Sequence, residues 1–407
     1  PGASPGRAAH GRRPGAIRAA AARAQARKMM ARNEICHYVC LSLLGFGIGV
    51  SSALWIYGDA GSASPNFLPV EGALEEQRFL IVDGMPRARG PRPSWLVQED
   101  QLMLDARPPA GQRKDGGILV VLASLEDAAG AWGKGHERPQ WLRACLAVTL
   151  HHTTRNRHAM ILRTQPTEPQ LTAWQVQQCG EKSSAQCRRD NERENYNWEK
   201  HLMLAQYMES PENFSHVLML DADAALVRPG IDTLQIMALK LEATGKDLYL
   251  SDEDWLLNGA GRINGGLIFA KNSKFSRDLF RDTFEAHVNG PKGLAKWRIG
   301  IEGLNCDSNE QICLDILYRG SAEGKKYFTP RVMVSSGIRY NRGACVLYAC
   351  TEPTLRPAEW KALGMNDPEM EVLHFMGSTK KHAVDALCTG KEDLVGKLRE
   401  YACETKR

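Results

Sequence analysis

The feature that most constrains this chain is an apolar run that ends in two carboxylates. Residues 217–220 read Val-Leu-Met-Leu, and Asp221-Ala222-Asp223 follows directly. A short run that is hydrophobic at every position predicts a strand buried on both faces of a mostly parallel sheet. Because side chains alternate along a strand, Asp221 and Asp223 are expected to point to the same side at its carboxyl end. Ligands bind at that end in open α/β sheets.

Holding two carboxylates close together costs free energy, and this cost suggests that the pair binds a cation. Two carboxylates held side by side repel each other, and burial adds the loss of their hydration. A divalent cation between them removes both penalties, so Asp221 and Asp223 are candidate metal ligands. The simpler alternative is an acidic loop that follows a strand and binds nothing.

Strand and helix patterns alternate around this motif. The first convincing strand lies within 116–124, and a helix over 141–150 and a strand over 159–162 complete a βαβ unit. Further strands are expected over 248–250, 267–269, 332–334 and 372–373, and further helices over 198–208, 275–284 and 308–317. Ser308 and Gln311 fit a capping box for the last helix, and Asn264-Gly265-Gly266 fits a turn. This order predicts an α/β fold with a mostly parallel sheet flanked by helices.

A long uncharged segment precedes the domain. Residues 35–57 carry no formal charge, and they can supply the ~20 residues with which a helix crosses a bilayer. Residues 1–34 are rich in Ala, Gly and Arg, which predicts a disordered basic tail. Because this tail is basic, it is expected in the cytoplasm and the rest of the chain in a lumen, as for a single-pass type II signal anchor of Golgi or ER membranes. A cleaved signal peptide and a transit peptide are the alternatives.

The remaining segments complete the expected organisation. Residues 58–115 hold many Pro, Gly and Arg with little periodicity, which is typical of a stem. The catalytic domain is expected over 116–390 and a C-terminal tail over 391–407. Because residue 1 is Pro, Met29 and Met30 are candidate start sites of translation.

Composition excludes one class of partner. The 407 residues are 43% hydrophobic and 24% charged, as in a globular protein. The formal net charge of +5 comes mostly from the first 32 residues, which carry no acid, and the rest is near neutral. No basic stripe with interleaved aromatic residues follows, so we expect no nucleic-acid partner.

Cysteines and a sequon bear on the compartment. Two of the eleven cysteines, Cys36 and Cys40, lie in the uncharged segment, and the nine that remain are an odd number, so at least one is a free thiol. Disulfides such as Cys179–Cys187 or Cys345–Cys350 fit a lumenal location, and no pair of CxxC motifs suggests zinc. Asn213-Phe214-Ser215 is a glycosylation sequon, which is consistent with the secretory pathway.

Several separated pieces resemble one known family in their order along the chain. Over residues 116–382 the chain resembles metal-dependent nucleotide-sugar glycosyltransferases of the GT-A type, with a pattern like that of the xyloglucan xylosyltransferase and mannan galactosyltransferase group. The matching pieces are Trp198-Glu199-Lys200, Asp221-Ala222-Asp223, Asn264-Gly265-Gly266, Asn309-Glu310-Gln311 and the His-x-x-Gly-x-x-Lys motif from His374 through Gly377 to Lys380. In the fourth piece Asn309 replaces an acidic residue of the family. The resemblance implies the GT-A, Rossmann-like fold.

The resemblance also implies a role for each matching residue. It implies a metal site of Asp221, Asp223 and His374, and mixed carboxylate and imidazole ligands suit Mn²⁺. It implies donor binding by Lys200, Asp221, Gly377 and Lys380, and places Asn264, Glu310 and Gln311 at the reacting sugar. The implied reaction moves a sugar, with UDP-sugars as preferred donors, to a glycan or glycoprotein acceptor with retention of configuration. A homo- or hetero-oligomer is compatible with the sequence.

Each motif also has a plainer explanation. His374 fits a hydrogen-bonded histidine at a strand end, Gln311 fits helix capping and Lys380 fits a solvated surface lysine. Two other function classes are compatible with the acidic pair. A haloacid-dehalogenase-like phosphatase would use the first aspartate as nucleophile and the second as general acid. A catalytically silent lumenal binding protein could share the fold.

The uncharged segment generates a testable expectation about topology. A tag at the C-terminus should resist protease in intact microsomes, because the basic N-terminal flank is expected to keep residues 1–34 in the cytoplasm. Asn213 should carry a glycan that endoglycosidase removes. A C-terminal tag that protease digests in intact microsomes would contradict the lumenal assignment, whereas the absence of a glycan alone would weigh little against it.

Overall fold

The computed structural model describes most of the chain after residue 78. The described residues are 79–82, 85–98, 100–113, 115–125, 138–164, 197–254, 261–306, 309–344, 370–389, 394 and 396–403. The expected basic tail and membrane anchor lie outside them, as do the cysteines of the two suggested disulfides. None of the helices in the described ranges has both the length and the hydropathy that a membrane span requires.

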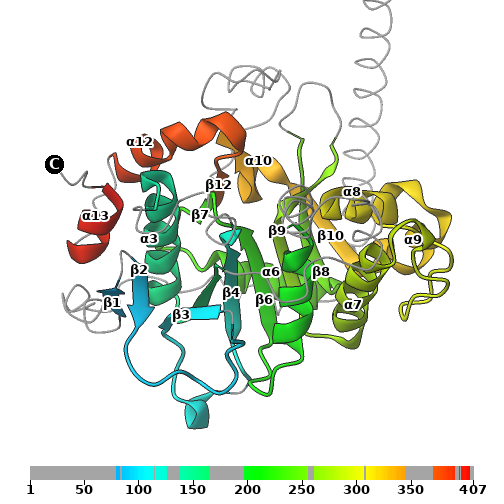
Figure 1. Cartoon of the computed structure of the whole chain (residues 1–407), viewed down its shortest axis with the longest axis horizontal. Coiled ribbons are helices and arrows are strands. Elements are labelled where there is room, and N and C mark those ends of the chain that lie inside the picture. The colour runs from blue at the N-terminus through cyan, green and yellow to red at the C-terminus, as the bar shows by residue number, and fades with distance from the viewer. Residues whose placement is uncertain are drawn as a thin grey trace, which may run out of the picture. The chain divides into compact units, whose positions relative to one another are not determined.

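A seven-stranded sheet forms the centre of the domain (Figure 1). Its order is β10 (Val332–Ser336), β8 (Leu248–Asp252), β9 (Ile263–Lys271), β6 (His216–Asp221), β4 (Ile118–Ala123), β5 (Ala159–Arg163) and β3 (Asp100–Asp105). β9 and β3 run antiparallel to their neighbours, and the other five strands share one direction. The predicted α/β fold with a mostly parallel sheet is therefore confirmed.

The central strand is buried on both faces, as its continuous apolar run predicts. Leu218 and Leu220 of β6 belong to a core shared with α3 (Gln140–Arg155). Val217 and Met219 face the opposite core, which includes Met203 from the helix over 197–208. Alternate side chains of one strand thus fill two separate hydrophobic layers, which fixes its register against slipping by one residue.

The other elements surround this sheet. Further α-helices in the described ranges are α6 (Thr233–Thr244), α7 (Lys274–Val288), α8 (Glu310–Asp315), α9 (Ala322–Tyr327), α10 (Gly337–Tyr340), α12 (Ala383–Cys388) and α13 (Gly396–Cys403). Short helical turns are η1 (Ala110–Gln112), η3 (Gly290–Lys292), η5 (Thr329–Arg331), η7 (Gly377–His382) and the π-helical η4 (Ile316–Gly320). Figure 1 shows α12 and α13 beside α3 at one end of the sheet and α8 and α9 at the other.

A second, three-stranded sheet brings distant parts of the chain together. Its order is β11 (Arg342–Gly343), β12 (Val372–His374) and β7 (Ala224–Leu226). β12 runs antiparallel to β7, with His374 opposite Ala224. β7 begins three residues after β6 ends, so this small sheet fixes the position of His374 relative to the acidic pair.

Two of the predicted domain boundaries need correction. The expected stem over 58–115 contains β1 (Phe79–Val82) paired with β2 (Met85–Ala88), and its β3 is an edge strand of the main sheet. Trp95 and Leu96 of the same segment are buried in the core. The expected tail over 391–407 contains α13, whose Leu398 joins the core next to α3. Sequence periodicity does not predict these elements, because each is short and depends on tertiary packing.

The fold accounts for a dependence of stability on pH that can be measured. Burial, together with the charges of Lys200 and His287, lowers the pKa of His201 to about 3. An unfolded chain binds this proton at about pH 6.5. The unfolded state therefore holds more protons between these values, so the free energy of unfolding falls as the pH falls, by about 1.4 kcal/mol per pH unit.

Replacing the histidine isolates its share of this dependence. His201→Asn can keep the hydrogen bond that joins Nδ1 to Thr283 Oγ1 at 2.7 Å, because the amide of Asn reaches the position of Nδ1. Above pH 7 the variant and the wild type should differ by a constant free energy of unfolding in urea titrations. Between pH 6 and pH 4 the free energy of unfolding of the wild type should fall relative to that of the variant by about 1.4 kcal/mol per pH unit, because the variant lacks the group that titrates. If the free energy of unfolding depended on pH in the same way in both proteins over that range, His201 would not be neutral in the folded state.

Candidate metal centre

Three candidate ligands converge at the carboxyl end of the central strand. Asp221 is the last residue of β6, Asp223 follows in a turn, and His374 is the last residue of β12. One ligand atom from each lies within 4.8 Å of those of the other two. His374 Nε2 lies 3.1 Å from Asp223 Oδ1 and 3.6 Å from Asp221 Oδ2. The structure thus brings together the three residues that the sequence nominated as metal ligands.

Backbone pairing explains how residues 151 positions apart meet. β7 begins directly after Asp223, and its antiparallel pairing with β12 sets His374 beside Ala224. The amide of Phe375 also donates a hydrogen bond to the carbonyl of Asp223 over 2.8 Å. The triad is therefore held by main-chain hydrogen bonds on both sides of the histidine.

The acidic pair converges for a reason that differs from the expected strand alternation. β6 ends at Asp221, and Ala222 and Asp223 form a turn rather than a continuation of the strand. The side chains meet because this turn leads back into β7. Their nearness is thus a property of the connection between two sheets.

Lys200 balances the first carboxylate. Its Nζ lies 2.7 Å from Asp221 Oδ1 and 3.0 Å from Glu310 Oε1. Although burial disfavours the ammonium ion, the charges of Asp221 and Glu310 raise the pKa of Lys200. The helix that carries it is anchored by Trp198, which is fully buried and stacks on His287 with ring centroids 4.5 Å apart.

Lys380 balances the second carboxylate. Its Nζ lies 3.3 Å from Asp223 Oδ2 and 4.5 Å from the centre of the Trp141 ring. The lysine belongs to η7, which opens at Gly377 with φ of 56°, a value that favours glycine. Its side chain is 28% exposed. Lys380 is therefore not a surface lysine that is solvated on all sides.

The charges of the site are mutually dependent. Burial alone would raise the pKa of Asp223, but His374 and Lys380 hold it well below its usual range. Burial likewise disfavours protonation of His374, yet the charge and hydrogen bond of Asp223 raise its pKa. Asp223 is therefore a carboxylate anion at neutral pH, which is the form that a metal ion binds.

Two glycines of β9 allow the functional groups to approach the sheet. A Cβ atom on Gly266 would lie 2.3 Å from His374 Cε1, and one on Gly265 would lie 2.9 Å from Glu310 Oε1. The pairing of β8 with β9 is irregular here, because Leu250 pairs with Ile268 and Ser251 with Asn264. The turn predicted at Asn264-Gly265-Gly266 is thus wrong. The three residues lie inside β9, where close contacts, not chain reversal, exclude larger side chains.

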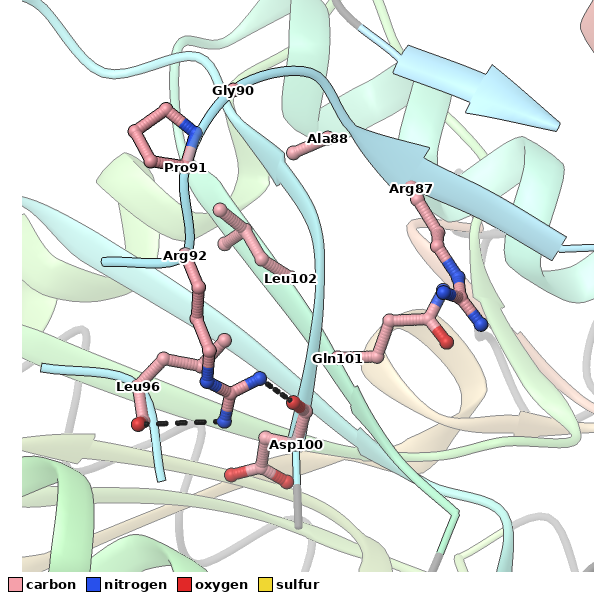
Figure 2. A pocket seen from close by; sticks show the side chains of 9 residues that line it. All are labelled: Arg87, Ala88, Gly90, Pro91, Arg92, Leu96, Asp100, Gln101 and Leu102. Atoms are coloured by element: carbon pink, nitrogen blue, oxygen red, sulfur yellow. Dashed lines mark hydrogen bonds between the residues drawn. The ribbon is translucent and has the colours of Figure 1, made fainter. Parts of the chain in front are cut away.

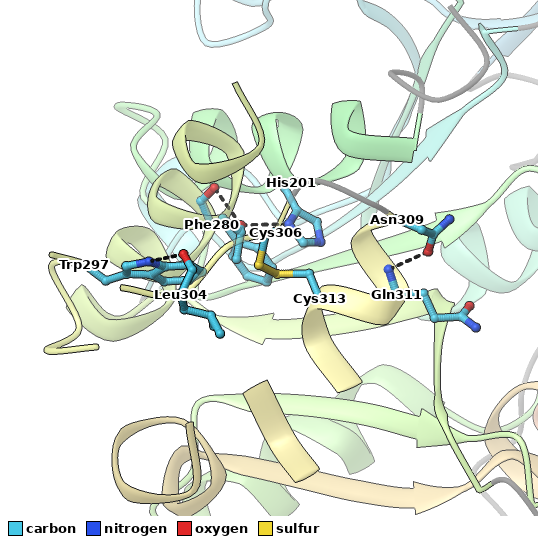
Figure 3. Close-up of a disulfide and its surroundings, with 9 residues drawn as sticks. His201, Phe280, Trp297, Leu304, Cys306, Asn309, Gln311 and Cys313 are labelled. Carbon is cyan, nitrogen blue, oxygen red and sulfur yellow. Dashed lines mark hydrogen bonds between the residues drawn. A yellow bond between two sulfur atoms is a disulfide. The ribbon is translucent and has the colours of Figure 1, made fainter. Parts of the chain in front are cut away.

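The short helix α8 carries Glu310 and Gln311 to the same place. Asn309 caps it by accepting from the amide of Gln311 at 2.9 Å, and Ser308 of the predicted capping box lies outside the described residues. The disulfide Cys306–Cys313 joins the preceding loop to this helix, as Figure 3 shows. Gln311 Oε1 accepts from the amide of Gly265 at 2.9 Å. Glu310 is 3% exposed, and within the described ranges its Oε2 atom has no hydrogen-bond partner.

The predictions from sequence do not include two buried residues that a chain of hydrogen bonds connects to His374. Asn341 Oδ1 lies 3.1 Å from His374 Nδ1, and Asn341 Nδ2 donates to Asn264 Oδ1 at 2.6 Å. Glu253 Oε1 accepts from Asn264 Nδ2 at 2.8 Å. Glu253 directly follows β8, and an acid at the carboxyl end of a strand was a usable signal. Asn341 offered none, because its role arises from the packing of α10 on β12.

The donor set fits a divalent cation. Two carboxylates and one imidazole nitrogen suit Mn²⁺ and related ions. Lys200 and Lys380 leave the site close to neutral without a bound ion, and Lys380 is the more exposed of the two lysines. Metal binding next to a lysine is an arrangement that can hold a diphosphate.

A shallow hollow elsewhere on the domain is unrelated to this centre. It has a volume of about 400 Å³ and lies between the end of β2 and the edge strand β3. Arg92 closes one side by donating to the carbonyl of Asp100 at 2.7 Å, and Figure 2 labels Arg87 and Gln101 among the other residues that line the hollow. It shares no residue with the triad or its lysines.

Comparisons with known proteins find similarity among solved structures. No family model matches the chain, and no curated protein matches it. A glycosyltransferase involved in the glycosylation of the major capsid of PBCV-1 is 8% identical with a TM-score of 0.39, over 66% of this chain and 98% of that one. Mouse xyloside xylosyltransferase 1 is 10% identical with a TM-score of 0.35, over 65% and 99%. The galactosyltransferase LgtC is 12% identical with a TM-score of 0.31, over 70% and 93%.

The contact between Gly266 and His374 gives a prediction about the metal centre. Gly266→Ala would place a methyl group 2.3 Å from His374 Cε1 and 2.7 Å from Nδ1, so the imidazole must leave its present position beside the carboxylates. We expect the affinity for Mn²⁺ to fall at least about tenfold, in line with other changes that misorient a metal ligand. Isothermal titration with Mn²⁺ measures this change.

Gly230→Ala is the matched control, because a Cβ atom there meets nothing within 4 Å and the residue lies outside the regular elements. Wild-type affinity in the control, together with a loss in Gly266→Ala, supports the geometry. Unchanged Mn²⁺ affinity in Gly266→Ala would show that His374 takes no part in metal binding.

Proposed function

We propose that this protein is a metal-dependent glycosyltransferase that moves a sugar from a nucleotide sugar, UDP-linked by preference, to a glycan or glycoprotein acceptor. The convergence of Asp221, Asp223 and His374 within 4.8 Å carries this proposal. These residues belong to two motifs that resemble the same GT-A glycosyltransferases. The triad lies where open α/β sheets bind ligands, at the carboxyl end of a strand.

The charged groups around the triad suit a diphosphate leaving group. A divalent ion held by the triad would stabilise the negative charge that develops on the departing nucleoside diphosphate. Lys380, beside Asp223, places a second positive charge at the same end of the site. Lys200 holds Asp221 at 2.7 Å and so fixes the orientation of this carboxylate.

Residues of α8 and β9 suit the sugar end of the donor. Gln311 is fixed by the Gly265 amide and by its place at the start of α8. Glu310 Oε2 is buried and, in the part of the chain that is described, accepts no hydrogen bond. A sugar hydroxyl can supply the missing donor, and such a bond to a charged acceptor contributes about 1.5–3 kcal/mol. We assign Glu310 and Gln311 to sugar orientation in a reaction that retains configuration.

The phosphatase alternative conflicts with the charges of the site. In that mechanism the second aspartate donates a proton as a general acid. Here Asp223 lies between His374 and Lys380, which hold its pKa well below its usual range. A carboxylate that stays ionised at neutral pH is a metal ligand rather than a proton donor.

Two disulfides support the proposed lumenal location. Cys306 pairs with Cys313, and Cys388 pairs with Cys403. Structural disulfides persist in oxidising compartments, including the ER lumen and the cell exterior. Together with the uncharged segment over 35–57 and its basic flank, they favour a Golgi or ER membrane protein whose catalytic domain is lumenal.

A panel of nucleotide sugars tests the proposal. The purified full chain should release nucleoside diphosphate from at least one sugar donor in the presence of Mn²⁺ and lose this activity in EDTA. Asp223→Asn and His374→Ala should each abolish most transfer, and the double variant should be no worse than either single one, because the site is already lost. Product release assays measure the nucleoside diphosphate, and mass spectrometry of the acceptor measures the transferred sugar.

A variant outside the site checks that folding is not the cause. Lys274→Ala removes an exposed lysine that pairs with Asp278 on the surface of α7, and it should keep wild-type transfer. Transfer that continues in EDTA and in the double variant would contradict the proposal. Phosphate release from simple phosphoesters without sugar transfer would favour the phosphatase.

A further inference from the structure

We propose that Glu253, Asn264 and Asn341 form a hydrogen-bond relay that fixes the tautomer and orientation of His374, so that Asn264 is a positioning residue rather than a contact of the donor sugar. The inference rests on the proposed function, because it assigns His374 to a metal. It differs from the role that the family resemblance implies for Asn264.

The relay is buried and continuous. Glu253, Asn264, Asn341 and His374 are each no more than 3% exposed. Hydrogen bonds of 2.8 Å, 2.6 Å and 3.1 Å connect them in this order. They come from the end of β8, the start of β9, the end of α10 and the end of β12, so four separate elements meet behind the triad.

Two groups that cannot reverse their roles fix the amide of Asn264. The backbone N–H of Gly266 can only donate, and it donates to Asn264 Oδ1 at 2.8 Å. The carboxylate of Glu253, which also forms an ion pair with Arg262, accepts from Asn264 Nδ2. Both contacts require the same orientation of the amide, so its oxygen faces Asn341.

This orientation propagates to the histidine. Since Asn264 presents an oxygen, Asn341 must present its Nδ2 atom, which donates over 2.6 Å. Asn341 Oδ1 then faces His374 Nδ1 at 3.1 Å and can only accept. One proton must therefore reside on Nδ1 of His374. Nε2 faces both aspartates and shares its own proton with Asp223, so this is the proton that a cation displaces when it binds the Nε2 lone pair.

Asn264 has no remaining hydrogen-bonding capacity for a substrate. An asparagine side chain offers two N–H donors and two lone pairs on its oxygen. Gly266 and Asn341 occupy the oxygen, whereas Glu253 and the sulfur of Met376, at 3.7 Å, occupy the nitrogen. A donor sugar could reach this amide only by displacing one of these partners from a buried site.

The relay should be measurable as metal affinity in the absence of any donor. Groups that orient a metal-bound histidine typically contribute 10–100-fold to metal affinity. A structural role alone would lower stability and leave the affinity of the folded protein unchanged. A direct contact with the donor would lower transfer and leave Mn²⁺ binding unchanged.

Substitutions at Asn341 separate the relay from general packing. Asn341→Leu removes both hydrogen bonds and keeps the branched shape and the number of side-chain heavy atoms. Asn341→Asp loses the bond to Asn264 but still presents an acceptor to His374 Nδ1. We expect Mn²⁺ affinity of the full chain to fall roughly 10–100-fold in Asn341→Leu and to stay within about threefold of the wild type in Asn341→Asp. Asn264→Leu should behave like Asn341→Leu.

Asn272→Leu is the matched control. Asn272 follows the far end of β9, where it donates to the carbonyl of Phe214 at 2.8 Å and accepts from Arg277 at 2.6 Å. The control removes two hydrogen bonds, as Asn341→Leu does, but lies outside the relay. It should bind Mn²⁺ like the wild type. Thermal unfolding without metal shows that each variant is folded, and Asn341→Ser replaces Asn341→Leu if the latter does not fold.

The outcomes distinguish this proposal from the proposed function. Wild-type binding that Asp223→Asn removes, together with unchanged affinity in Asn341→Leu and Asn264→Leu, would overturn the relay and leave the metal site standing. Equal losses in Asn341→Asp and Asn341→Leu would also overturn it, because an acceptor at His374 would then be irrelevant. No Mn²⁺ binding by the wild type would overturn both proposals.

Discussion

The carboxylate of Asp223 is the group on which the rest of the site depends. It is largely buried between His374 and Lys380, with Asp221 and Lys200 behind it. Burial of an unpaired charge costs several kcal/mol, so His374 and Lys380 beside Asp223, and Lys200 beside Asp221, each offset the charge of a carboxylate. The same balance leaves an ionised carboxylate beside an imidazole, which is what a divalent cation requires. The same ion pairs thus stabilise the site without a cation and keep the carboxylate ionised so that it can bind one.

The fold delivers these groups through its irregular parts. The regular strands supply a rigid edge, and the ligands come from the end of β6, the turn that follows it and the end of β12, whereas the irregular start of β9 packs against them. The missing side chains of Gly265 and Gly266 admit Glu310 on one side and His374 on the other. A disulfide between Cys306 and Cys313 then restrains the helix that carries Glu310 and Gln311. These two glycines therefore indicate close packing and not a flexible segment.

The sequence predicted the parts of this account that depend on local pattern. Uniformly apolar runs predicted β4 and β6 correctly, because only a strand buried on both faces tolerates such runs, and the acidic pair after β6 predicted the position of the triad. What it missed depends on contacts between distant segments. Asn264-Gly265-Gly266 was interpreted as a turn, since nothing local shows that His374 and Glu310 press on these glycines. Glu253 and Asn341 were overlooked for the same reason, and short packed elements were assigned to a stem and a tail.

The central claim is that His374 Nε2 binds the same metal ion as the two aspartates. Electron spin-echo spectroscopy of the Mn²⁺-loaded full chain tests it most directly, because the method detects nitrogen nuclei coordinated to the metal. We predict a signal from one imidazole nitrogen in the wild type. This signal should disappear in His374→Gln, in which the residual Mn²⁺ stays bound by carboxylates alone. A wild-type spectrum without coordinated nitrogen, or one that His374→Gln leaves unchanged, would contradict it.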